Sequence, residues 1–172
     1  REVGGYDPTL IAGEEPDLCL RLRRRGHRIV RVDHEMTLHD AAMTRFEQWW
    51  KRSVRSGHAY AEGAYRHGRG PERHWVRETA RLAFFGVGIP VASVGLAPMT
   101  FGASLGLLSA YPLSAYRSYR ASRRRGRDVR DAAIYAAFTT LGKFPEAQGA
   151  AQFVRDRLRG RASQIIEYKG VE

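Results

Sequence analysis

The chain has 172 residues, a net charge of +11 and a pI of about 10.5, which suit one small domain with a core and a partner that carries phosphates. Its single cysteine, Cys19, excludes an internal disulfide framework and any zinc site built from several cysteines. The chain begins with Arg1 rather than Met, so we expect it to be the C-terminal part of a longer protein.

The first predicted element is a helix that begins near Pro16 and ends before Gly26. Pro16 suits the first turn, where its missing N–H leaves no hydrogen bond unmade, and Gly26 suits a left-handed cap after a run of arginines. Acidic side chains favour the positive end of the helix dipole, and three lie at this start: Glu14, Glu15 and Asp17. These acids have two open interpretations, as charges that only cap the helix or as a catalytic cluster.

The next segment, residues 28–32, is rich in β-branched residues that alternate loosely with arginine, which predicts a strand. A helix that ends before Gly26 and is followed by a strand predicts that residues 1–42 belong to an α/β fold. Residues 43–74 follow as amphipathic helices, with one face beside basic residues that carries Phe46, Trp49, Trp50 and Val54. That face suits a bilayer surface and a protein core equally well.

A long apolar run, residues 82–116, contains no Asp, Glu, Lys, Arg or His. As one continuous helix it would be roughly 52 Å long, which far exceeds a hydrocarbon core of about 30 Å. Pro98 lies near its middle, so we expect two short apolar helices that turn back there, with kinks at Pro90 and Pro112. Because arginines flank both ends, the positive-inside rule predicts a membrane hairpin over residues 75–117 with both ends in the cytoplasm. A soluble, Gly- and Ala-rich helical core is the alternative.

The last segment, residues 118–172, reads as a basic connector followed by amphipathic helices. We expect helix over 132–158, with a break around Pro145. The predicted fold class is therefore an α/β fragment followed by a mainly helical, membrane-associated region, and the predicted location is the cell membrane with the α/β part in the cytoplasm.

Two motifs at the start of the chain are similar to those of family 2 glycosyltransferases. Residues 4–7 read GGYD, residues 13–23 read GEEPDLCLRLR, and Gly26 follows at the family's spacing. The resemblance covers about residues 1–40 and implies the C-terminal part of a GT-A fold, a Rossmann-like domain that binds a nucleotide sugar. It also implies inverting transfer of a sugar to an acceptor hydroxyl, where the acceptor is a sugar or a lipid-linked molecule.

The resemblance also assigns roles to individual residues. Glu15 matches the family's general base, although Asp is commoner at that position, and Glu14 becomes a supporting carboxylate. A general base must lie within hydrogen-bond reach of the acceptor hydroxyl, and neighbouring negative charge makes a carboxylate more basic. Four residues are expected at the acceptor: Asp17, Gly13, Gly5 and Arg21.

A divalent metal, Mn or Mg, is expected in the intact enzyme. The family holds it with an Asp-x-Asp motif upstream of these motifs, and this sequence contains no Asp-x-Asp. His39 is the candidate metal ligand here, since it lies where the family often has a histidine after the next strand, and His34 is its rival.

Two other functions compete with glycosyl transfer. A non-catalytic basic membrane protein that binds anionic lipid would explain the arginines around the apolar run. A nucleic-acid binder would explain the net charge, but the chain has no zinc-finger pattern or recognisable RNA-binding signature, so we expect no nucleic acid among its partners.

Overall fold

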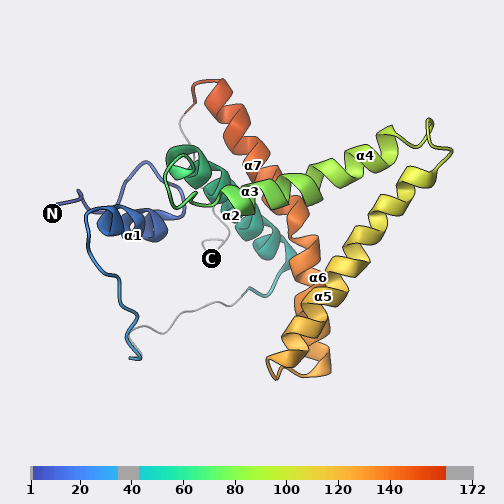
Figure 1. Ribbon diagram of the computed structural model, residues 1–172, viewed down its shortest axis with the longest axis horizontal. Helices are drawn as coiled ribbons and strands as arrows, with labels where there is room; N and C mark the ends of the chain where they lie inside the picture. The colour runs from blue at the N-terminus through green and yellow to red at the C-terminus, as the bar shows by residue number, and fades with distance from the viewer. Residues whose placement is uncertain (1, 35–42, 162–172) are drawn as a thin grey trace.

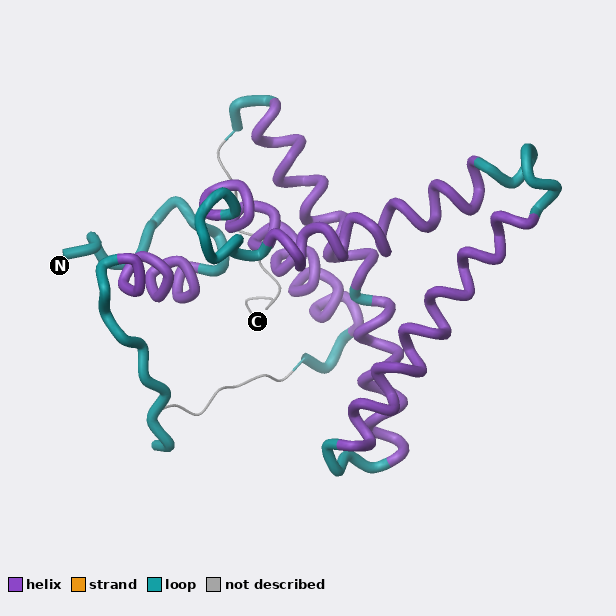
Figure 2. Tube along the Cα trace, viewed as in Figure 1, coloured by secondary structure: helices purple, strands orange, loops and turns teal. Residues whose placement is uncertain are grey.

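The computed structural model describes residues 2–34 and 43–161, and within these ranges all regular structure is helical (Figures 1 and 2). The α-helices are α1 (Glu14–Arg24), α2 (Phe46–His67), α3 (Val76–Ala83), α4 (Ile89–Gly95), α5 (Ala110–Arg124), α6 (Val129–Leu141) and α7 (Lys143–Leu158). A π-helical turn (Phe84–Gly88) joins α3 to α4, and a 3-10 helix (Ala103–Ser109) leads into α5. The predicted α/β, Rossmann-like GT-A fragment is therefore wrong for the described residues.

The strand predicted at residues 28–32 shows why that prediction failed. The segment has no helical structure, but no second strand lies beside it among the described residues. Val30 and Val32 are 70% and 59% exposed, although β-branched residues of a sheet are normally covered. A strand is defined by hydrogen bonds to a neighbour, so composition alone does not make one.

The predicted first helix is confirmed as α1. It begins at Glu14, ends at Arg24, and Gly26 follows with a φ of 86° in the left-handed region. The backbone N–H groups of Arg25 and Gly26 donate to carbonyls of the last turn, and therefore close the helix as the sequence predicts.

The core forms where α2 and α7 cross near the centre of the molecule (Figure 1). Gly57 of α2 and Gly149 of α7 allow the two backbones to touch. A Cβ on Gly57 would lie 2.5 Å from the Cα atom of Glu146, and one on Gly149 would lie 2.8 Å from the backbone nitrogen of His58. Since neither distance leaves room for a methyl group, both positions require glycine.

The aromatic face of α2 packs mainly on protein. Val54 is buried, the Trp49 ring meets Phe138 of α6 edge-on with centroids 4.9 Å apart, and the Trp50 indole donates to Gln148 of α7 over 3.0 Å. Phe46 at the start of α2 is 54% exposed, so the core interpretation of this face holds for Val54, Trp49 and Trp50 but not for Phe46.

The apolar run 82–116 forms two arms that meet at a tip, as Figure 1 shows for α4 and α5. The chain turns back between α4 and the 3-10 helix, where Gly102 has a φ of 84°, so the turn predicted near Pro98 is confirmed. The π-helical turn lies directly before Pro90, which cannot donate a backbone hydrogen bond. Pro112 lies in the first turn of α5, a position that tolerates proline without the predicted kink.

No helix among the described residues is long and apolar enough to cross a membrane. The apolar run is divided into α-helical, π-helical and 3-10 segments, and the second half of α5 is rich in arginine. This finding contradicts the predicted membrane hairpin at 75–117 and the predicted location at the cell membrane.

The basic connector also differs from expectation. Residues 117–124 continue α5, which packs against α6 as an antiparallel partner after a short turn at 125–128. The break expected at Pro145 falls instead at Gly142, and Pro145 is buried in the first turn of α7.

Candidate functional site

The GGYD turn is fastened to α2. Gly4 and Gly5 have φ angles of 76° and 73°, which lets the chain reverse before Asp7. The Asp7 carboxylate accepts hydrogen bonds from the backbone and hydroxyl of Thr9 at 2.8 and 2.6 Å, and Arg66 of α2 donates to it over 2.8 Å. The Thr9 hydrogen bonds and then the Arg66 charge lower the pKa of Asp7. The turn therefore has a fixed position on the C-terminal half of α2.

Gly13 positions the start of α1 above an aromatic ring. Its φ is 85°, and a Cβ there would lie 2.8 Å from the Trp75 ring. Only about 10 Å³ of space remains at this junction, among Gly13, Asp17, His67 and Trp75. Because that volume holds no more than one water, this junction is closed to any larger molecule.

The three carboxylates at the start of α1 have different environments. Asp17 is 6% exposed, whereas Glu14 and Glu15 are exposed and make no hydrogen bond or ion pair to any other described residue. No side chain caps this helix. Glu14 and Glu15 therefore do not cap α1 by hydrogen bonding, although their charges still favour the positive end of its dipole.

Asp17 and Arg21 join three parts of the chain. One Asp17 oxygen lies 2.6 Å from His67 Nε2 at the end of α2, and the other accepts from Arg21 Nε over 2.8 Å. Arg21 also donates to the backbone carbonyls of Val3 and Gly5. The predicted acceptor residues Gly5, Gly13, Asp17 and Arg21 thus lie in one assembly around α1, and both carboxylate oxygens of Asp17 are already used.

A second set of contacts ties α1 to the loop after α2. Arg24 pairs with Glu72 at 3.0 Å and lies 3.3 Å from His67 Nδ1. His74 stacks on Trp75 with ring centroids 4.3 Å apart. Burial, and after it the electrostatic effect of the neighbouring His67 ring, lowers the pKa of His74.

Sequence reasoning missed the residues that support α1 from outside its own segment, above all His67 and Trp75. His67 had one usable signal, its place in the last turn of a predicted helix, where basic side chains are common. Nothing local indicated that it would meet Asp17, which is 50 positions away in the chain.

The residues described here hold no group of three or more His, Cys, Asp and Glu side chains that could bind a metal ion. His39 lies outside the described residues. His34 is exposed and belongs to no such group.

Comparison with known proteins links the chain to one named activity. It is 31% identical over 123 residues to the pre-mycofactocin glycosyltransferase of Mycobacterium tuberculosis, in strains CDC 1551 / Oshkosh and ATCC 25618 / H37Rv. The match covers 72% of this chain but only 23% of those proteins. No protein-family profile matches the chain, and no solved structure matches it. The similarity is therefore distant, and this chain spans less than a quarter of the length of the glycosyltransferases that it matches.

Proposed function

We propose that this chain carries the acceptor-side carboxylates of an inverting glycosyltransferase similar to family 2, with Glu15 as general base and Glu14 as its supporting carboxylate. One observation carries the proposal: Asp17 is buried and held by His67 and Arg21, while Glu14 and Glu15 face solvent with no partner among the described residues. The charges of both glutamates favour the positive end of the helix dipole, and of the three carboxylates these two are the ones that remain free to accept a proton.

The proposed step transfers one sugar. Glu15 accepts the proton of the acceptor hydroxyl, and the resulting oxygen forms a bond to the anomeric carbon of the donor sugar. The bond between that carbon and the diphosphate oxygen breaks, and its electron pair leaves with the nucleoside diphosphate. Because attack and departure occur on opposite faces, the anomeric configuration inverts. General-base catalysis of this kind contributes about 10²–10⁴-fold in rate.

The neighbouring residues position this base. Asp17 and Arg21 hold the GGYD turn against α1, and Gly13 directly precedes Glu14 and Glu15 at the start of that helix. The Trp75 ring packs against Gly13 and so supports the start of α1. Placement on a helix that these contacts hold in position keeps the carboxylate within reach of one hydroxyl.

The donor in this proposal is a nucleotide sugar, and Mn or Mg would neutralise its diphosphate in the intact enzyme. The described residues do not fit a metal site of their own, so no step here passes through a metal. The name of the Mycobacterium tuberculosis relatives makes pre-mycofactocin one acceptor to test.

The test compares Glu15→Gln with Glu14→Gln in the complete gene product. Release of nucleoside diphosphate is measured with UDP-glucose, UDP-galactose and GDP-mannose as donors and pre-mycofactocin as acceptor, beside thermal unfolding of the same samples. We expect Glu15→Gln to lose at least about a hundredfold in kcat with an unchanged melting temperature. Near-normal turnover in Glu15→Gln would refute the assignment, and a larger loss in Glu14→Gln would move the base one residue upstream.

A further inference from the structure

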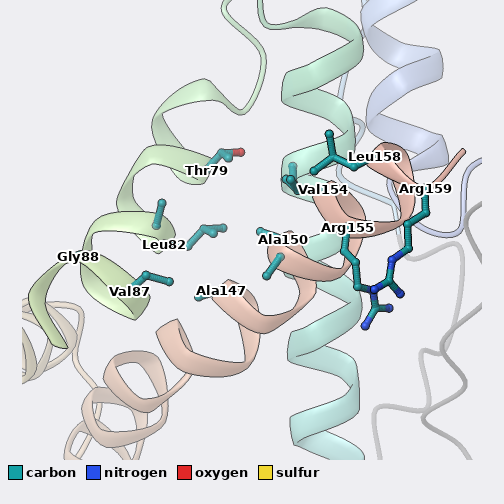
Figure 3. A pocket seen from close by; sticks show the side chains of 13 residues that line it. Thr79, Leu82, Val87, Gly88, Ala147, Ala150, Val154, Arg155, Leu158 and Arg159 are labelled. Carbon is teal, nitrogen blue, oxygen red and sulfur yellow. The ribbon is translucent and has the colours of Figure 1, made fainter. Parts of the chain in front are cut away.

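An apolar groove separates α3 and the π-helical turn from α7 (Figure 3). Its volume is about 690 Å³, and its walls come from Leu82, Ala83 and Val87 on one side and Ala147, Ala151 and Val154 on the other. Thr79 brings a hydroxyl to the wall, but that hydroxyl already donates to the carbonyl of Tyr60 over 2.9 Å. The groove therefore offers almost only apolar surface.

Large side chains along this groove remain exposed to water. Val87 is 49% exposed, Val154 is 51% exposed and Leu158 is 83% exposed. Burial of such surface is favourable roughly in proportion to its area, so an apolar chain in the groove would gain by covering it. The lining spans α7 from Ala147 to Leu158, which corresponds to a length of about 17 Å along the helix.

One end of the groove is cationic. Arg155 in the last turn of α7 and Arg159 directly after its end are one helical turn apart, and Figure 3 shows their side chains extending beside each other. Arg155 uses Nε for Asp156 at 3.1 Å, and no other partner contacts its terminal nitrogens among the described residues. The Arg159 side chain likewise has no hydrogen bond or ion pair within residues 2–34 and 43–161. Two like charges one turn apart repel each other, and a shared anion would relieve that repulsion.

We propose that this groove binds a single-chain alkyl phosphate, with the chain along α7 and the phosphate between Arg155 and Arg159. A phosphate monoester carries a charge of about −1.5 to −2 near neutral pH, which matches two guanidinium groups, and guanidinium binds phosphate through paired hydrogen bonds. The site goes beyond the proposed function and does not depend on it, because none of its residues belongs to the assembly around Glu15.

The binding test uses calorimetry with dodecyl phosphate, hexyl phosphate and inorganic phosphate, each below its micelle concentration. Every methylene that the groove covers should strengthen binding about fourfold, so the dodecyl compound binds far more tightly than the hexyl compound, and inorganic phosphate binds most weakly. Dodecanol and dodecyltrimethylammonium carry the same chain without the negative charge, and we expect at least tenfold weaker binding of each.

Variants separate the two halves of the site. The double substitution Arg155→Gln and Arg159→Gln should lower the affinity for dodecyl phosphate at least about tenfold, and Ala151→Phe should do so by filling the groove. Matched controls lie elsewhere on exposed helical surface: Arg124→Gln on α5 and Ala133→Phe on α6. Both controls should bind dodecyl phosphate as the unaltered protein does, with unchanged circular dichroism in all four proteins.

Three results would overturn the proposal. Affinity that does not grow with chain length would exclude the groove, and binding of dodecanol or dodecyltrimethylammonium as tight as that of dodecyl phosphate would exclude the phosphate. A dimer in sedimentation experiments that Ala151→Phe dissociates would assign the groove to a second copy of the chain.

Discussion

The crossing of α2 and α7 predicts a large cost for one added methyl group, Gly57→Ala. The new Cβ would lie 2.5 Å from Glu146 Cα, about 0.9 Å short of the 3.4 Å at which ordinary van der Waals contact begins. The obstacle is backbone, which cannot rotate away as a side chain can. Because the Glu146 carbonyl oxygen would lie nearer still, the two helices would have to separate by at least about 1 Å, and a gap of that size forfeits about a quarter to a half of each dispersion contact across the crossing.

The free energies can be compared directly. Overpacking of a core costs about 1–3 kcal/mol, and a rigid backbone obstacle belongs at the upper end, about 3 kcal/mol. Alanine regains about 1 kcal/mol because it is the better helix former. The net loss in the free energy of unfolding is therefore about 2 kcal/mol, which lowers the melting temperature by about 4–8 °C in a chain of this size.

Thermal unfolding followed by circular dichroism measures this loss, with Gly95→Ala as the matched control. Gly95 ends α4, and a Cβ there would meet nothing within 4 Å, so the control should melt at or slightly above the temperature of the unaltered protein. The double substitution Gly57→Ala and Gly149→Ala should cost less than the sum of the single changes, since one separation of the helices accommodates both methyl groups. If Gly57→Ala melts at the same temperature as Gly95→Ala, the close crossing of α2 and α7 is refuted.

Three further predictions concern the surroundings of α1 and the core. Asp17→Asn weakens two hydrogen bonds to a buried carboxylate, so urea unfolding should show a loss of about 2 kcal/mol, and an unchanged midpoint would contradict the role of Asp17 as a structural link. Gly13→Ala should destabilise more than Gly26→Ala in the same assay, because both have positive φ but only the first meets the ring of Trp75; equal losses would rule out that contact. Burial lowers the pKa of His58 below 6.5, so as the pH drops the unfolded chain binds a proton at this residue before the folded chain does, and the free energy of unfolding falls below about pH 6.5. His58→Gln should flatten that decline when the free energy of unfolding is measured from about pH 7.5 to 5. An unchanged slope in this variant would show that another group causes the decline.

The sequence predicted several elements correctly because their signals are local. The helix with Gly26 after its end and the turn near Pro98 follow from residues whose own backbone preferences decide the geometry. The strand at 28–32 failed, because a strand depends on a partner elsewhere in the chain. The membrane hairpin failed because a run without charges does not reveal how often its helix is interrupted.

In the candidate site, too, some features follow from local sequence and others from contacts with distant parts of the chain. The motif marked Glu14, Glu15 and Asp17 as one acidic cluster, and their shared place at a helix start is a local property. The structure separated them, since Asp17 meets His67 from 50 positions away while the two glutamates remain exposed. Whether a carboxylate is free or occupied depends on what the rest of the chain brings to it.

By itself, the sequence of this protein determined where α1 begins and ends and where its carboxylates gather, because capping, helix dipole and glycine dihedrals act within a few residues. Only the tertiary structure decided that α2 and α7 touch through Gly57 and Gly149, and that Arg155 and Arg159 border an apolar groove. Both features arise from helices that are distant in the chain, whose fit depends on the shapes of complete surfaces rather than on any local preference.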